Sequence, residues 1–99
     1  MKRTESERTP REAALLGARL ADAEGYRVVS REGREVGVLD HVRYEQFADH
    51  PDEIVVARRA FLVRREGIVP FAAVDSVDRD RRVVYLRIGH REIARAPAR

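Results

Sequence analysis

Few residues of this chain are of a type that performs catalysis, and their spacing argues against it. There is no cysteine, which removes thiol nucleophiles, thiolate metal sites and disulfides together. The three serines, Ser6, Ser30 and Ser76, do not lie in the setting of a nucleophile elbow. Asp40 and His41 are neighbours on a predicted strand, so we expect their side chains to point to opposite faces. We therefore predict no catalytic residue and no enzymatic activity.

One loop gathers the kind of groups that bind hard metal ions. His50 is close in sequence to Asp49, Asp52 and Glu53, and this set could hold a divalent ion weakly. A solvated acidic loop with a histidine in its turn explains the same residues, and we favour that interpretation. The sequence also lacks a glycine-rich phosphate loop and a dinucleotide fingerprint. We expect neither a metal nor a cofactor.

The charge is high but mixed in sign. The chain carries 20 lysine and arginine residues against 17 acidic ones, a net charge of +3. Residues 1–50 have a net charge of −1 and residues 51–99 a net charge of +4. All basic residues but Lys2 are arginine, which can pair bidentately with carboxylate or phosphate. We favour a solvated mixed-charge surface over a dedicated polyanion site.

With 99 residues the chain has room for one domain and one core. No apolar run approaches the roughly 20 residues that cross a bilayer, and no apolar leader follows Met1. We expect a cytoplasmic protein that does not insert into membranes.

Residues 9–24 have the pattern of a helix. Thr9 can cap it, Pro10 suits its first position, and Glu12 stands where a capping box needs an acid. Gly25 is well placed to end it.

The apolar stripe of this helix is narrow and rich in alanine, so it must dock on something. It consists of Ala13, Leu16, Leu20 and Ala23. The stripe could pack on the sheet of its own chain or on a neighbouring molecule. In the second case Leu16 and Leu20 would be partner-binding residues.

From Tyr26 the apolar residues follow a strand pattern. Residues 26–30 and 34–44 predict two strands of a hairpin, with Gly33 at a positive φ in the turn. Within the second strand Val36, Val38, Val42 and Tyr44 are in phase, whereas Leu39 is out of phase and Gly37 lacks a side chain. This predicts a bulge or bend there.

The middle of the chain predicts two more strand segments, residues 53–57 and 60–64, interrupted by Arg58-Arg59. Arg65-Glu66-Gly67 repeats the earlier Arg31-Glu32-Gly33 and predicts a second turn. Phe47 is expected to anchor the loop before these strands. Phe61 and Phe71 lie in apolar runs and are expected in the core.

The stretch Ile68–Ile88 is the centre of the predicted sheet. After a turn at residues 78–80 it ends in a strand with Val84, Leu86 and Ile88 on one face and Val83, Tyr85 and Arg87 on the other. The first face is apolar and belongs in a core, while the second should face solvent or a partner. Residues 89–99 form a basic tail, in which Ile93 can add a short docked segment.

Taken in order, these motifs resemble the PRC-barrel family, named for the photosynthetic reaction-centre H subunit and also found as the C-terminal half of the ribosome maturation factor RimM. The matching stretches are Gly33–Val38, Val42, Val69-Pro70-Phe71 with Val74 and Val77, and Arg82–Leu86. The resemblance implies a mainly β fold, a small antiparallel barrel of about six strands, and an interaction module without shared catalytic residues. The predicted helix and the lack of a RimM-type N-terminal domain distinguish this chain from both relatives.

These inferences divide the chain into a flexible N-terminus (1–8), a helix (9–24), a PRC-barrel-like domain (25–88) and the basic tail (89–99). We predict a non-enzymatic module that self-associates or docks on a protein partner. The alternative is binding of single-stranded nucleic acid, or association with the ribosome, through an Arg/Tyr face. The candidate partner-binding residues are Leu16, Leu20, Arg58, Arg59, Tyr85 and Arg87.

Overall fold

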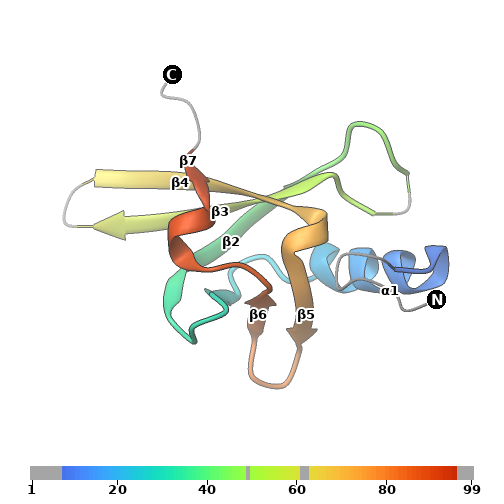
Figure 1. Cartoon of the computed structure of the whole chain (residues 1–99), viewed down its shortest axis with the longest axis horizontal. Coiled ribbons are helices and arrows are strands. Elements are labelled where there is room, and N and C mark those ends of the chain that lie inside the picture. The colour runs from blue at the N-terminus through green and yellow to red at the C-terminus, as the bar shows by residue number, and fades with distance from the viewer. Residues whose placement is uncertain (1–7, 49, 61–62, 96–99) are drawn as a thin grey trace.

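The computed structural model describes residues 8–48, 50–60 and 63–95, and Figure 1 shows the whole chain. It contains one α-helix, two short 3-10 helices and seven strands. They are α1 (Pro10–Ala21), β1 (Arg27–Val29), β2 (Glu35–Arg43), β3 (Glu53–Ala60), β4 (Val63–Pro70), η1 (Phe71–Ala73), β5 (Val74–Asp78), β6 (Val83–Leu86), η2 (His90–Glu92) and β7 (Ala94–Arg95).

The strands form one sheet in the order β5-β6-β1-β2-β3-β4-β7. The expected mainly β fold with one N-terminal helix is confirmed. Two details differ from the prediction: the described residues give seven strands instead of about six, and β1 pairs with β6 in parallel while the other pairs are antiparallel. The sheet is strongly curved but not closed.

The predicted helix start is confirmed at the level of atoms. The Thr9 side chain accepts a hydrogen bond from the Glu12 amide (3.1 Å), and the Glu12 carboxylate accepts one from the Thr9 amide (3.0 Å). The helix ends earlier than expected, at Ala21, with Asp22 as its C-cap. Gly25, which was predicted to end it, has a positive φ of 84° in the loop that follows.

The helix packs on the sheet of its own chain, against β5 and β2. Leu16 is 7% exposed and Leu20 is fully buried, because both side chains point into the single core that lies between α1 and the concave face of the sheet. Within this fold, Leu16 and Leu20 are core residues and are not open to a partner.

The bend in β2 is confirmed, and the phase predicted for this strand is partly wrong. Val36 and Val42 pack against the core as predicted, but the register of β2 against β3 shifts between Leu39 and His41. Leu39 is 1% exposed, whereas Val38 is 40% and Tyr44 47% exposed. The bulge therefore buries the residue that appeared out of phase.

The turn predicted at Arg65-Glu66-Gly67 is wrong. These residues lie inside β4, which pairs with β3 from Glu53↔Pro70 to Ala60↔Val63. Arg58-Arg59 likewise does not interrupt a strand but continues β3. Regular pairing over eight residues makes the hairpin longer than the sequence pattern indicated. Phe61 lies outside the described residues.

Strand β6 follows the predicted alternation except at Val83. Val84 and Leu86 are buried as expected, but Val83 is also buried, at 2% exposure. It pairs with Arg27 of β1 on one side and with Asp78 of β5 on the other, so both neighbouring strands shield it. Tyr85 and Arg87 remain partly exposed.

Replacement of Leu20 by alanine tests the docking of α1. Leu20→Ala should lower the free energy of unfolding by about 2–5 kcal/mol, because it leaves a cavity in the core. Leu15→Ala is the matched control: Leu15 is 55% exposed on the same helix, and its loss should change stability by less than about 0.5 kcal/mol. Equal effects in urea denaturation would contradict the docking described above.

A pair of glycine variants tests the close approach of β2 to β3. Gly37 has a positive φ of 148°, and a Cβ there would lie 2.4 Å from the carbonyl oxygen of Ala57. Gly33 also has a positive φ, 84°, but a Cβ would meet nothing within 4 Å. Gly33→Ala should therefore lower the free energy of unfolding by about 1–2 kcal/mol because of backbone strain. Gly37→Ala should lower it clearly more, because the contact with Ala57 is added to the strain. A smaller loss for Gly37→Ala, measured by thermal unfolding, would refute this packing.

Candidate partner-binding grooves

The segment after β6 is fastened to the β1–β2 turn by two carboxylates. Glu32 accepts a hydrogen bond from the His90 amide (3.1 Å) and lies 3.4 Å from the ring Nδ1 of His90. Its carboxylate sits so close to Gly89 that a Cβ there would lie 2.6 Å from Oε2. Hydrogen bonds from Ser30, the Glu32 amide and the His90 amide lower the pKa of Glu32 to about 2.

The second carboxylate belongs to Glu92. It accepts hydrogen bonds from the Gly89 amide (3.0 Å) and from the guanidinium of Arg31 (3.2 Å). The Arg31 amide in turn donates to the Ile88 carbonyl (2.8 Å). We call these contacts of Glu32 and Glu92 the carboxylate clasp. It holds residues 88–92 on the sheet, and β7 then pairs with Gly67 and Ile68 of β4.

The lowered pKa of Glu32 predicts how the stability that the clasp contributes depends on pH in acid. The pKa of Glu32 is lowered from 4.5 to about 2 in the folded state. Its contribution to the free energy of unfolding is therefore fully present above pH 4.5 and is lost as the pH falls from 4.5 to about 2. Glu32→Gln should therefore be less stable than the wild type at pH 7, and the difference should shrink between pH 4.5 and pH 2.

Denaturant unfolding at several pH values measures this difference. Glu24→Gln removes an equal charge from the exposed loop after α1 and controls for net charge. A Glu32→Gln curve parallel to the wild-type curve across the acid range would show that the clasp does not stabilise the fold.

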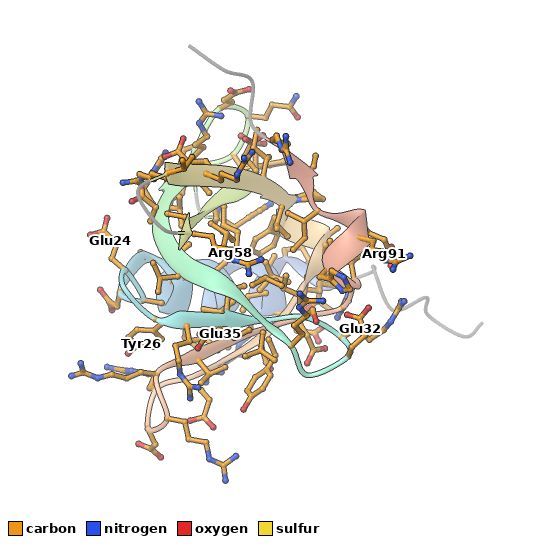
Figure 2. All side chains as sticks on the ribbon, turned by 90° about the vertical axis from the view of Figure 1, so that its left-hand side faces the viewer. Glu24, Tyr26, Glu32, Glu35, Arg58 and Arg91 are labelled. Carbon is orange, nitrogen blue, oxygen red and sulfur yellow. The ribbon has the colours of Figure 1, made fainter. Side chains whose placement is uncertain are left out.

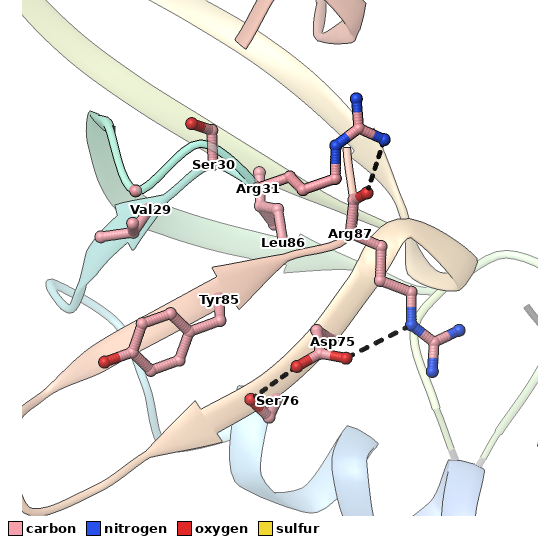
Figure 3. Close-up of a pocket in the computed structure, with 9 residues that line it drawn as sticks. Val29, Ser30, Arg31, Asp75, Ser76, Tyr85, Leu86 and Arg87 are labelled. Carbon is pink, nitrogen blue, oxygen red and sulfur yellow. Dashed lines mark hydrogen bonds and ion pairs between the residues drawn. The ribbon is translucent and has the colours of Figure 1, made fainter. Parts of the chain in front are cut away.

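A depression of about 510 Å³ lies between the β1–β2 turn and strands β5 and β6. We call it the Tyr85 groove (Figure 3). It is lined by Val29, Ser30, Arg31, Gly33, Asp75, Ser76, Tyr85, Leu86 and Arg87. The predicted residues Tyr85 and Arg87 thus do share one surface.

The arginines of the Tyr85 groove are held in place by the chain itself. Arg87 lies 3.5 Å from the Asp75 carboxylate and donates to the Ala72 carbonyl, and its side chain is 21% exposed. Arg31 donates to the carbonyl of Arg87 (3.4 Å). Figure 3 shows the contact of Arg31 with the Arg87 carbonyl and that of Arg87 with Asp75, with Tyr85 in the same groove. The groove therefore presents a tyrosine and two guanidinium groups that the chain engages, and no histidine lines it.

A second depression, of about 170 Å³, is strongly basic. We call it the arginine groove. Its charged lining consists of Arg34, Arg58, Arg65, Arg95, His90 and a single acid, Glu66, while Val36, Val56, Gly67, Ile93 and Ala94 form the rest. Glu66 is paired with Arg64 (3.1 Å). Arg58, predicted as a partner-binding residue, therefore belongs to a different groove from Tyr85 and Arg87.

A third depression, of about 440 Å³, lies beside the start of α1 and is mostly apolar. Phe47 stacks on His50 with ring centroids 4.3 Å apart, and His50 lies 4.6 Å from Phe71. The guanidinium of Arg8 covers the Phe71 ring at 5.4 Å, and burial lowers the pKa of Arg8. Phe47 anchors the loop as expected, although its side chain remains 46% exposed.

Asp40 and His41 are closer than the sequence predicted. The β-bulge in β2 brings His41 Nδ1 to 2.6 Å from the Asp40 carboxylate, so their side chains do not point to opposite faces. Arg64 of β4 donates to the other oxygen at 2.6 Å. These hydrogen bonds, His41 first, lower the pKa of Asp40, and Asp40 raises the pKa of Arg64. All three side chains are partly exposed, so the pair with Arg64 adds little stability.

The acidic loop is organised by internal contacts. Asp52 accepts hydrogen bonds from the amides of Glu45 and Gln46, and Glu53 pairs with Arg43 at 3.1 Å. Asp49 lies outside the described residues. Among residues 8–48, 50–60 and 63–95, no group of three or more histidines and acids is placed to hold a metal ion.

The sequence pointed to Tyr85, Arg87 and Arg58, and to Arg65 on a strand near Arg58, but it did not join Arg34 and Arg95 to them. These come from different elements, which meet through the β3–β4 pairing and the return of β7. One local signal was present: Arg58-Arg59 and Arg64-Arg65 stand symmetrically about the hairpin connection. Arg59 lies opposite Arg64 in the register, and its side chain is outside the described part of the chain.

A comparison with models of protein families agrees with this fold. The PRC-barrel domain model matches residues 17–93, from within α1 to the residue before β7. The chain belongs to the PRC-barrel family. The matched residues include the clasp and the whole lining of the Tyr85 groove. From the end of the arginine groove they include Ile93 but not Ala94 or Arg95.

PRC-barrel domains are generally non-catalytic and are interaction-type domains. A search of curated proteins found no match to this chain. Within the part of the chain that the structure describes, no helix is both long enough and apolar enough to cross a membrane.

Proposed function

We propose that this PRC-barrel domain is a non-enzymatic module that docks on a protein partner through the Tyr85 groove. The observation that supports this most directly is the pre-ordered pair of guanidinium groups, Arg31 and Arg87, beside Tyr85. Tyrosine and arginine are the residue types that contribute most binding energy at protein interfaces. Because Arg31 and Arg87 are already engaged by contacts within the chain, less of their side-chain entropy should be lost on binding.

The form of the groove suits a protein segment better than a small substrate. It is open, it combines Tyr85, Val29 and Leu86 with polar groups at its rim, and no histidine lines it. Leu16 and Leu20 are buried in the core of their own chain. This burial supports the groove over the apolar helix stripe as the contact surface if the partner is a second copy of the chain.

Affinity capture with nuclease-treated lysate, followed by titration of the purified partner, tests the proposal. Tyr85→Ala should weaken the affinity at least about tenfold, and Ser76→Arg, which fills the rim without removing packing, should do the same. Tyr44→Ala removes a 47% exposed tyrosine elsewhere and should bind like the wild type.

Two results would overturn this function. One is capture of proteins that is equal for the wild type, Tyr85→Ala and Ser76→Arg. The other is a wild-type chain that retains no protein and remains a monomer in light scattering at high concentration. Thermal unfolding of each variant separates lost binding from lost folding.

A further inference from the structure

The arginine groove contains positive charge that the described residues do not neutralise. Arg58 and Arg65 are directly opposite each other on β3 and β4, and neither forms an ion pair within the described part of the chain. Like charges directly opposite on paired strands are destabilising. The neighbouring Arg64, by contrast, is paired with Asp40 and Glu66. The fold thus leaves an uncompensated arginine pair on one face of the hairpin.

Two further arginines extend this charge across three elements. Arg34 comes from the β1–β2 turn, where its guanidinium lies 3.2 Å from His90 Nε2, and Arg95 comes from β7. Arg95 is opposite Gly67, whose missing side chain lets Ile93 pack closely on β4, since a Cβ there would lie 2.7 Å from Ile93 Cγ2. The carboxylates of Glu32 and Glu92, the nearest clasp acids, are already engaged by backbone amides. A bound anion would reduce the repulsion among these arginines, which the described residues of the chain do not neutralise.

The shape of this region indicates which anion fits. The depression holds about 170 Å³ and has no phenylalanine, tyrosine or tryptophan in its lining, so it can accept a phosphate group but lacks the large aromatic platforms on which bases stack. The β3–β4 hairpin extends beyond the other elements at one end of the molecule (Figure 1). Figure 2 views that end, with Arg58 above Glu35 and Glu32. A two-stranded ribbon with arginines is a form that the grooves of a duplex admit.

We propose that the arginine groove binds the phosphate backbone of double-stranded nucleic acid without reading its sequence. Arg58 and Arg65 would contact phosphate oxygens through their planar guanidinium groups, and Arg34 and Arg95 would extend the contact along the backbone. This site is separate from the Tyr85 groove, so either can fail without the other.

Fluorescence anisotropy with a short mixed-sequence DNA duplex tests the proposal on the full chain. Four phosphate contacts predict an affinity loss of roughly 100-fold between about 50 and 200 mM salt. Arg58→Gln combined with Arg65→Gln should reduce the salt dependence by about half and weaken binding at low salt. The double variant should be at least as stable as the wild type, because the opposed charges are removed.

The control is Arg11→Gln combined with Arg79→Gln, two exposed arginines outside the groove. This control removes the same charge and should retain the groove's binding, as should Tyr85→Ala. The proposal is overturned if duplex DNA and duplex RNA fail to bind at low salt, or if both double variants bind equally. It is also overturned if the matching single strand or a poly-glutamate peptide binds more tightly than the duplex at the same salt.

Discussion

The two grooves of this curved sheet depend on how two carboxylates hold the C-terminal segment. Glu32 and Glu92 accept backbone hydrogen bonds from residues 89 and 90, and Arg31 joins Glu92 to the β1–β2 turn. Gly89 permits the close approach of Glu32. The Arg31 amide also donates to the Ile88 carbonyl, and the clasp adds to this tie between the C-terminal segment and the β1–β2 turn. With the clasp, β7 reaches the outer edge of β4, on the far side of the sheet from β5.

The clasp separates two grooves of different character. On one side, Arg31 and Arg87 are ordered beside Tyr85 by contacts within the chain. On the other, His90, Ile93 and Arg95 complete a wall that faces the opposed arginines of β3 and β4. The first surface offers aromatic and apolar contact, the second almost pure positive charge. The two binding functions that we propose, for a protein partner and for a polyanion, would therefore use different surfaces of the domain.

Much of the fold could be predicted from the sequence, because local patterns decide it. The capping box at Thr9, the positive φ at Gly33 and the turn before β6 each depend on residues close together in the chain. The errors arose where pairing between distant strands overrides a local pattern. The bulge in β2 buried Leu39 and joined Asp40 to His41, and regular β3–β4 pairing replaced the expected turn at residues 65–67. Contacts between distant elements also divide the candidate residues: Leu16 and Leu20 lie in the core, Arg58 in the arginine groove, and Tyr85 and Arg87 in the Tyr85 groove.

Amide hydrogen exchange in the double variant Glu32→Gln, Glu92→Gln is the most direct measurement of whether the clasp builds these surfaces. If it does, the amides of β7 and those of Gly67 and Ile68 should exchange faster than in the wild type, while the β3 amides paired with β2 keep their protection. Unchanged protection of β7 and its partners on β4 would contradict the account. In that case strand pairing alone would hold the C-terminal segment, and the grooves would not depend on the carboxylates.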